Sequence, residues 1–141
     1  MRDTPLGVSG ENVEIVRALY ERFNARDADG VSELIAPDAR FRFIVWGPDM
    51  SRTYEGREAG ARFWEEEVFP VFPDFRMDPE DIVSEGDRVV ATIHNTGRGA
   101  QSGLEVDLRT AVLIELRDAM LASLEVFETR AEALAAAGLA E

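Results

Sequence analysis

The sequence predicts an α+β domain built from one antiparallel sheet with helices packed on one of its faces. Helical periodicity dominates the chain up to residue 69, apart from one strand-like segment. Four strand-like segments then follow one another without a helix between them, and a short alanine-rich helical segment comes last. This segregation of helices and strands is typical of α+β folds.

Three helices are expected before residue 70. They cover residues 10–26, 28–36 and 57–69, each with apolar side chains at helical spacing. Ser9 and Asp27 are suited to cap the first two helices at their N-termini. Pro70 ends the third helix, and residues 1–9 are expected to form a flexible tail.

The strands are expected to build one sheet. They cover residues 39–46, 75–87, 88–96, 104–117 and 119–128. Phe41, Phe43 and Val45 alternate with polar residues, which indicates one apolar face. Pro79 indicates an edge strand or a bulge, and residues 47–56 are expected to form a loop.

A short helix is expected at the C-terminus. Thr129 and Glu132 have the spacing of a capping box, and Gly138 suits the end of the helix. No repeat or linker divides the chain, so residues 1–141 are expected to form a single domain.

Composition excludes several classes of partner and chemistry. The net charge of −13 disfavours nucleic acid and anionic membrane surfaces, which are themselves densely negative. Without cysteine there is no disulfide, thiol nucleophile or zinc–thiolate site. The sequence shows neither a membrane-length apolar run nor a secretion signal, so a cytoplasmic location is expected. The run Glu65–Glu67 is expected to be a solvated helix face rather than a metal site.

Four stretches cover nearly the whole chain, namely residues 11–41, 54–64, 85–99 and 108–134. In this order they resemble the nuclear transport factor 2-like superfamily, in particular its SnoaL-like, polyketide cyclase-like branch. The resemblance implies a cone-shaped, strongly curved antiparallel sheet wrapped around N-terminal helices (a cystatin-like α+β barrel), with an apolar pocket inside. It also implies a homodimer formed through the convex sheet face. Binders, enzymes and accessory domains share this shape, so the shape assigns no activity.

Strand alternation assigns side chains to the two faces of the sheet. On strand 104–117 the even-numbered residues are plainly the buried set. On strand 88–96 the apolar pattern would bury the odd-numbered residues, whereas the resemblance points the even-numbered ones into the pocket. We expect the even set to face inward. The odd set would then join a convex dimer interface made of Val89, Ala91, Ile93, Ala111, Leu113 and Phe127.

With this assignment the sequence predicts an apolar pocket for a small hydrophobic molecule. Its lining would be Leu19, Phe23, Phe41, Phe43, Trp64, Val90, Thr92, Leu108, Thr110, Val112, Leu124 and Val126, with His94 among them. Trp46 and Trp64 are expected to be core or rim residues.

The catalytic patterns of the superfamily are largely missing. The resemblance gives positions for the carboxylates of its epoxide hydrolases and for the base and donors of its ketosteroid isomerases. All are apolar here: Val90, Val126, Phe43, Leu19 and Val112. His94, the one histidine of the chain, and Arg88 are the remaining candidate catalytic residues.

Both candidates also have structural interpretations. His94 could be a half-buried strand residue whose ring is satisfied by a hydroxyl group or water, since no catalytic partner is evident. Arg88 could form an ion pair with Glu85, Asp87 or a neighbouring strand, and this interpretation is favoured over a ligand clamp.

Three functions therefore stay open. The first is a small-molecule binding or accessory protein. The second is a cofactor-free isomerase, cyclase or dehydratase acting on a hydrophobic carbonyl compound, with His94 as base and Arg88 or Thr92 as donor. The third is a non-catalytic dimerisation module whose pocket is simply core. None of the three requires a metal or cofactor.

Overall fold

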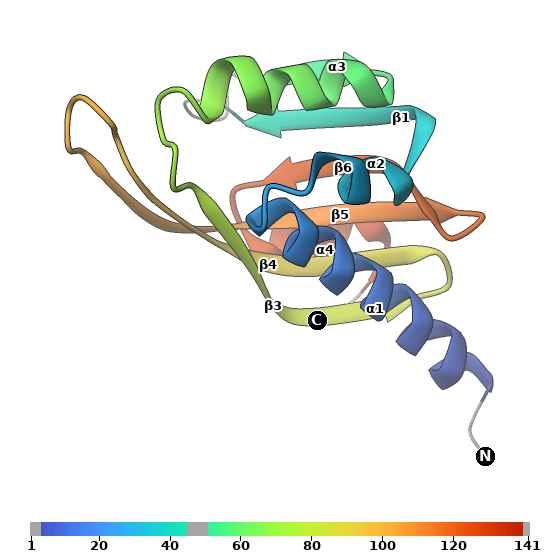
Figure 1. Cartoon of the computed structure of the whole chain (residues 1–141). Helices are drawn as coiled ribbons and strands as arrows, with labels where there is room; N and C mark the ends of the chain where they lie inside the picture. The colour runs from blue at the N-terminus through green and yellow to red at the C-terminus, as the bar shows by residue number, and fades with distance from the viewer. Residues whose placement is uncertain (1–3, 45–50, 140–141) are drawn as a thin grey trace.

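The computed structural model describes residues 4–44 and 51–139 and confirms the α+β class (Figure 1). Its elements are α1 (Thr4–Asn24), α2 (Ala28–Glu33), β1 (Ile35–Ile44), β2 (Ser51–Glu55), α3 (Arg57–Arg62), the π-helix η2 (Phe63–Val68), β3 (Arg76–Glu85), β4 (Arg88–Arg98), β5 (Glu105–Arg117), β6 (Met120–Phe127) and α4 (Arg130–Ala137). Val45 and Trp46 lie outside the described residues. Helix α1 begins at Thr4 rather than after Ser9, and Pro5 in its first turn is compatible with a helix because an N–H there would have no partner.

The strands form one six-stranded sheet in the order β2-β1-β6-β5-β4-β3. Neighbouring strands are antiparallel except β1 and β6, which run parallel, with Phe41 beside Leu124. The sheet is therefore mixed rather than wholly antiparallel. Strand β2 lies within residues 47–56, where a loop was expected. Tyr54 of this strand packs on Phe43 of β1, with ring centroids 5.8 Å apart.

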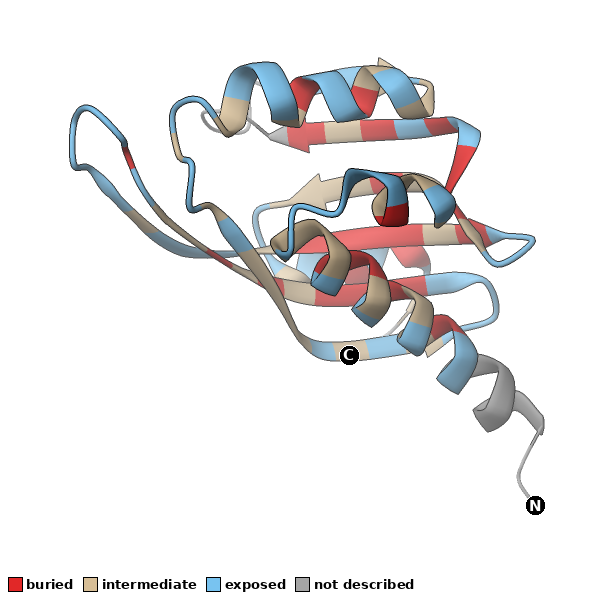
Figure 2. Ribbon diagram, viewed as in Figure 1, coloured by how far each residue is buried: buried red, intermediate tan, exposed pale blue. Residues whose placement is uncertain are grey.

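Each face of the sheet carries its own hydrophobic core. The inner face, covered by α1, α2 and α3, holds the larger cluster, which includes Val16, Tyr20, Ile93 and Ile114. The outer face holds a smaller cluster in which Leu134 and its neighbours on α4 pack against β4 and β5. Figure 2 shows the burial concentrated along the central strands, while the hairpin that joins β4 to β5 is mostly exposed.

The outer edge of β3 is closed by a side chain of α1. Asn24, the last residue of α1, donates from Nδ2 to the carbonyl oxygen of Met77 (2.9 Å) and accepts from the Met77 N–H at Oδ1 (2.9 Å). The Asn24 side chain thus supplies the donor and the acceptor that a neighbouring strand would offer to the Met77 backbone. Pro79, two residues along, has no N–H to offer. Edge strands protected in this way resist pairing with other chains.

We expect Asn24→Ala to uncover this edge. The two hydrogen bonds to the Met77 backbone and a longer one to Asp78 Oδ1 (3.4 Å) are lost, so the free energy of unfolding should fall by about 1–2 kcal/mol. The specific readout is hydrogen exchange of the Met77 amide, which should become much faster. Glu21→Ala, an exposed change on the same helix, is the control and should leave that amide protected. Unchanged protection of Met77 in Asn24→Ala would contradict this account of the edge.

The predicted helix over 57–69 is present, but its second half is a π-helix. Phe63 and Val68 are five residues apart, and so are Trp64 and Phe69; the Phe69 N–H donates to the Trp64 carbonyl oxygen at 2.9 Å. An α-helix would turn residues five apart onto different faces, whereas π-type hydrogen bonding aligns them. The two apolar pairs therefore stay on the protein side. Glu65–Glu67 are exposed, which confirms the predicted solvated face.

The terminal helix α4 follows its sequence signals closely. The Thr129 side chain accepts from the Glu132 N–H, and the Glu132 side chain accepts from the Thr129 N–H, which is a complete capping box. Gly138 ends the helix with φ 78°, in the left-handed region that glycine adopts without strain.

Candidate functional site

Strand β4 places its odd-numbered residues on the inner face, so the expected facing was wrong. Val89, Ala91 and Ile93 belong to the inner cluster, while Val90 belongs to the outer one. Register explains this result: Ile93 lies opposite Thr110, and residues directly opposite on antiparallel strands share a face. The apolar pattern of β4 pointed to this arrangement, and the resemblance pointed away from it.

The predicted pocket residues consequently separate onto two faces. Those buried in the inner cluster are Leu19, Phe41, Phe43, Val112 and Leu124. Trp64 and Val126 pack against that cluster half-buried, and the half-buried Phe23 contacts the Trp64 ring. Leu108 and Thr110 lie on the same inner face of β5. Val90, Thr92 and His94 face the opposite side, so they do not contribute to a site on the inner face.

The inner face is tightly covered at one end and open at the other. Along β5, Leu116, Ile114 and Val112 are 5%, 0% and 4% exposed. Thr110 is only half-buried, and Leu108 is 50% exposed. The inner surface therefore opens toward the hairpin between β4 and β5, and we call this part the open end.

Aromatic rings border the open end. Trp64 of η2 contacts Phe23 of α1 edge-on at 4.9 Å between centroids, and Phe75 at 5.8 Å. Phe75 in turn lies against β4, because a Cβ built on Gly97 would come within 3.2 Å of its ring. The three aromatic side chains are half-buried, so part of each ring faces the surface. Small-molecule sites are lined predominantly by hydrophobic and aromatic side chains.

Arg26 holds this aromatic border in place. Its Nη2 donates to the carbonyl oxygens of Pro73 and Phe75, each at 2.8 Å. Its guanidinium lies 4.0 Å from the centroid of the Phe69 ring. An arginine that makes both kinds of contact fixes the segment before β3 to the end of α1.

Asn95 is the inner-face polar residue that the sequence reasoning missed. It is 8% exposed, and its Nδ2 lies 3.2 Å from the Ile93 carbonyl oxygen, 3.2 Å from that of Leu108 and 3.1 Å from Thr110 Oγ1. Three acceptors around Nδ2 fix which end of the amide is nitrogen. Oδ1 receives no hydrogen bond from the residues that the structure describes. The sequence did carry a signal for this residue. The apolar pattern of strand 88–96 indicated that the odd-numbered side chains are buried, and Asn95 belongs to that set together with Ile93.

The inner cluster consists of apolar and aromatic side chains. Tyr20 and Tyr54 are the ionisable residues there. Burial raises the pKa of Tyr20 well above its ordinary value, so its phenol stays neutral at physiological pH. The inner face therefore offers apolar surface and the hydrogen-bonding groups of Asn95 and Thr110, with the Arg26 guanidinium at its aromatic border.

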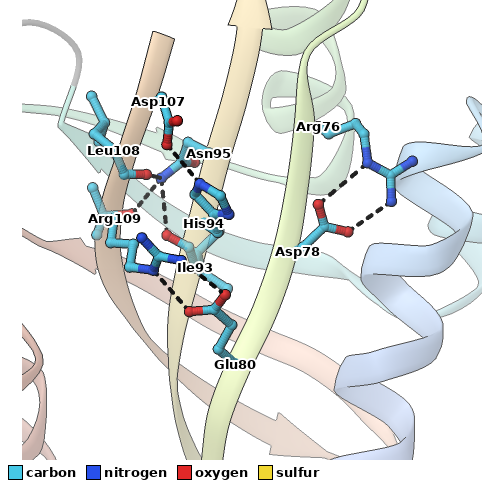
Figure 3. A network of polar contacts seen from close by, with 10 residues as sticks. Arg76, Asp78, Glu80, Ile93, His94, Asn95, Asp107, Leu108 and Arg109 are labelled. Atoms are coloured by element: carbon cyan, nitrogen blue, oxygen red, sulfur yellow. Dashed lines mark hydrogen bonds and ion pairs between the residues drawn. The ribbon is translucent and has the colours of Figure 1, made fainter.

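His94 lies on the outer face in a network of charged side chains (Figure 3). Its Nε2 is 2.7 Å from Oδ1 of Asp107, a partner on β5 that the sequence did not reveal. Beside it, Arg109 reaches across β4 to Glu80 on β3, with Nε 2.9 Å from Oε1. The hydrogen bond from Arg109 lowers the pKa of the Glu80 carboxyl group. The structural interpretation of His94 as a strand residue is supported, with a carboxylate as its partner instead of a hydroxyl group.

The other outer-face candidates also have structural partners. Arg88 Nε is 3.3 Å from Glu115 Oε2 on β5, and its Nη1 donates to the Ala137 carbonyl oxygen at 2.7 Å. The favoured interpretation of Arg88, an ion pair with a neighbouring strand, is confirmed. Thr92 Oγ1 accepts a hydrogen bond from Arg130 of α4 at 3.3 Å.

The residues expected at a dimer interface do not form one surface. Val89, Ala91 and Ile93 are inside the inner cluster. Ala111 and Leu113 belong to the outer cluster, against which Phe127 packs, and α4 covers this cluster from within the same chain.

No helix among residues 4–44 and 51–139 is long and apolar enough to cross a membrane. Within the same ranges, no group of three or more histidine, aspartate or glutamate side chains is placed to hold a metal ion.

Comparisons with known proteins found one matching family model and several similar solved structures. The family model described as SnoaL-like domain matches residues 16–124. The candidate SnoaL-like polyketide cyclase from Jannaschia sp. CCS1 is 26% identical, with 90% of this chain and 89% of that chain covered and a TM-score of 0.73. IdmH, a candidate polyketide cyclase from Streptomyces antibioticus, is 24% identical over 91% and 99% of the two chains, with a TM-score of 0.71. TerC, co-crystallised with polyporic acid, is 22% identical over 86% and 94%, with a TM-score of 0.70. No curated protein matches the sequence significantly.

Proposed function

Because the chain belongs to the SnoaL-like domain family, we propose that it binds a small, flat hydrophobic molecule at the open end of the inner face. The observation that carries this proposal is the break in burial along β5. Its inner side chains change from fully covered at Ile114 to 50% exposed at Leu108. The half-buried rings of Trp64 and Phe75 stand beside this opening.

The chemistry of the opening favours binding over catalysis. A general base would have to lie within hydrogen-bond reach of the bound molecule. The described residues of the inner face supply Asn95, Thr110 and the Tyr20 phenol, none of which is a base near neutral pH. His94 lies on the other side of β4, with Asp107 as its partner. A catalytic role for His94 at this site is therefore not part of the proposal.

The names of the similar structures agree with a ligand of this kind. Two are candidate polyketide cyclases, and TerC was crystallised with polyporic acid. At these identities they support the fold, and the nature of the ligand rests on the residues of this chain.

A titration of the ¹⁵N-labelled protein with naphthalene, monitored by NMR, tests the proposal. We expect the Trp64 indole N–H and the Asn95 side-chain amide to shift together with one Kd. Leu108→Asp should weaken binding about tenfold or more, equivalent to about 1.4 kcal/mol, because it places a charge against an apolar ligand.

Two control variants make this test specific. Leu104→Asp changes another exposed leucine, 61% exposed and outside the strands, and should leave the Kd within about twofold. His94→Ala should also leave the Kd unchanged. If naphthalene shifts no signal of Trp64 or Asn95, or if Leu104→Asp weakens binding as much as Leu108→Asp, the proposal is wrong.

A further inference from the structure

We infer that the site selects uncharged aromatic molecules that carry a hydroxyl group, and that Asn95 is the residue that recognises the hydroxyl hydrogen. This inference rests on the proposed function and names the class of ligand. It starts from the side-chain amide of Asn95, which is 8% exposed.

The orientation of that amide is fixed. Nδ2 faces the carbonyl oxygens of Ile93 and Leu108 and the hydroxyl oxygen of Thr110, at 3.1–3.2 Å. A rotation that exchanged Nδ2 with Oδ1 would place an oxygen against the carbonyl oxygens of Ile93 and Leu108 and lose both of those hydrogen bonds. Asn95 therefore presents its Oδ1 as a fixed acceptor.

Within residues 4–44 and 51–139, neither a side chain nor the backbone donates a hydrogen bond to this Oδ1. Oδ1 itself is not fully buried, so water or a ligand donor can reach it. A ligand hydroxyl group can donate to Oδ1. An ether or a bare aromatic ring cannot, and would displace the water without replacing its bond.

Electrostatics limits the class of ligand further. A carboxylate ligand needs a cation or several N–H donors. A cation beside the open end, Arg26, already donates to the carbonyl oxygens of Pro73 and Phe75 and lies over the Phe69 ring. The net charge of −13 also repels anions at a distance. A phenol fits both constraints, because it is neutral near pH 7 and donates one hydrogen bond.

Four probes with one ring system test this inference: naphthalene, 2-naphthol, 2-methoxynaphthalene and 2-naphthoate. We expect 2-naphthol to bind roughly five- to tenfold more tightly than naphthalene, the effect of one added hydrogen bond. 2-Methoxynaphthalene carries the same oxygen without its hydrogen, so it should bind no better than naphthalene. 2-Naphthoate should bind more weakly than all three.

The variant Asn95→Leu tests whether Asn95 causes the preference for 2-naphthol over naphthalene. It removes Oδ1 and keeps the number and branching of the side-chain heavy atoms, so 2-naphthol and naphthalene should bind equally well, while naphthalene itself keeps its affinity. A preference for 2-naphthol that persists in Asn95→Leu would overturn the role of Asn95. Should this variant not fold, the comparison of 2-naphthol with 2-methoxynaphthalene on the natural chain decides whether a donated hydrogen is recognised.

The outcomes separate this inference from the proposed function. If none of the four probes binds, the function itself is wrong. If naphthalene binds and 2-naphthol binds no more tightly, the function stands and the selectivity for hydroxyl groups is wrong. Tighter binding of 2-naphthoate than of 2-naphthol would equally overturn the inference.

Discussion

Replacing Gly60 with alanine should lower the free energy of unfolding by about 1–3 kcal/mol, the cost of overpacking a well-filled core. Gly60 is the point where α3 rests on β1. A Cβ at this position would lie 2.6 Å from Cε2 and 2.9 Å from Cδ2 of Phe41. Real Cβ atoms do not approach an aromatic carbon so closely, so the ring or the helix has to move.

The Phe41 ring has little room to yield. It is 5% exposed and stacks on Phe43 at 5.7 Å between centroids, and Phe43 stacks on Phe63 at 4.5 Å. A shift of Phe41 therefore disturbs two further rings. Urea unfolding of Gly60→Ala measures the cost, and the double variant Gly60→Ala with Phe41→Leu should lose less than the sum of the two single changes.

Gly10→Ala is the matched control for this prediction. Gly10 also lies in a helix, but nothing stands within 4 Å of a Cβ at its position. Alanine should therefore stabilise α1 by up to about 1 kcal/mol through helix propensity alone. Equal effects of the two substitutions would show that the contact between Gly60 and Phe41 does not limit the packing.

Replacing Leu134 with aspartate should detach α4 from the outer face, at a cost of roughly 3 kcal/mol or more. Leu134 is 5% exposed and packs in the outer cluster with Val90, Ala111 and Leu113. A carboxylate at this position would be surrounded by the apolar side chains of the outer cluster. Once α4 leaves, a continuous apolar patch of the sheet meets water, and such patches promote association between molecules.

Light scattering coupled to size-exclusion chromatography measures this second prediction. Leu134→Asp should elute at a larger mass than the natural protein at the same concentration. Ala135→Asp places the same charge on the exposed side of the same helix and should not change the mass. If Leu134→Asp keeps both the mass and the stability of the natural protein, α4 does not protect the outer face.

Local signals in the sequence predicted the parts of the fold that depend on neighbouring residues. The capping box of Thr129 and Glu132 and the solvated run Glu65–Glu67 belong to this group, as does the inward facing of Val112. In each case the determining contacts lie within a few residues, or one strand face is clearly more apolar than the other.

Features that depend on strand pairing could not be obtained in this way. The sequence does not state that β1 pairs in parallel with β6, nor that the five residues of β2 pair with β1. Pairing also decides the partner of His94. It lies opposite Arg109, and its actual partner Asp107 is two residues earlier in β5. No spacing in the sequence reveals such a diagonal contact.

The candidate site was misplaced for a related reason. The apolar residues Val89, Ala91 and Ile93 indicated correctly which side of β4 is buried deepest, and the resemblance was given more weight. The expectation did not consider that one chain could cover both faces of its sheet. Helix α4 does so here, and both alternating sets of β4 therefore include fully buried residues.

The π-helix and the central strands respond differently to a change in chain length. In η2, apolar pairs recur every five residues, and the loss of one glutamate would reduce that repeat to the four of an ordinary α-helix. The apolar side chains of η2 would then still face the interior of the protein. In β5, the loss of one residue would send every later side chain into the opposite core. Insertions and deletions among relatives should therefore accumulate between Phe63 and Phe69 and avoid residues 111–114, where both faces are filled.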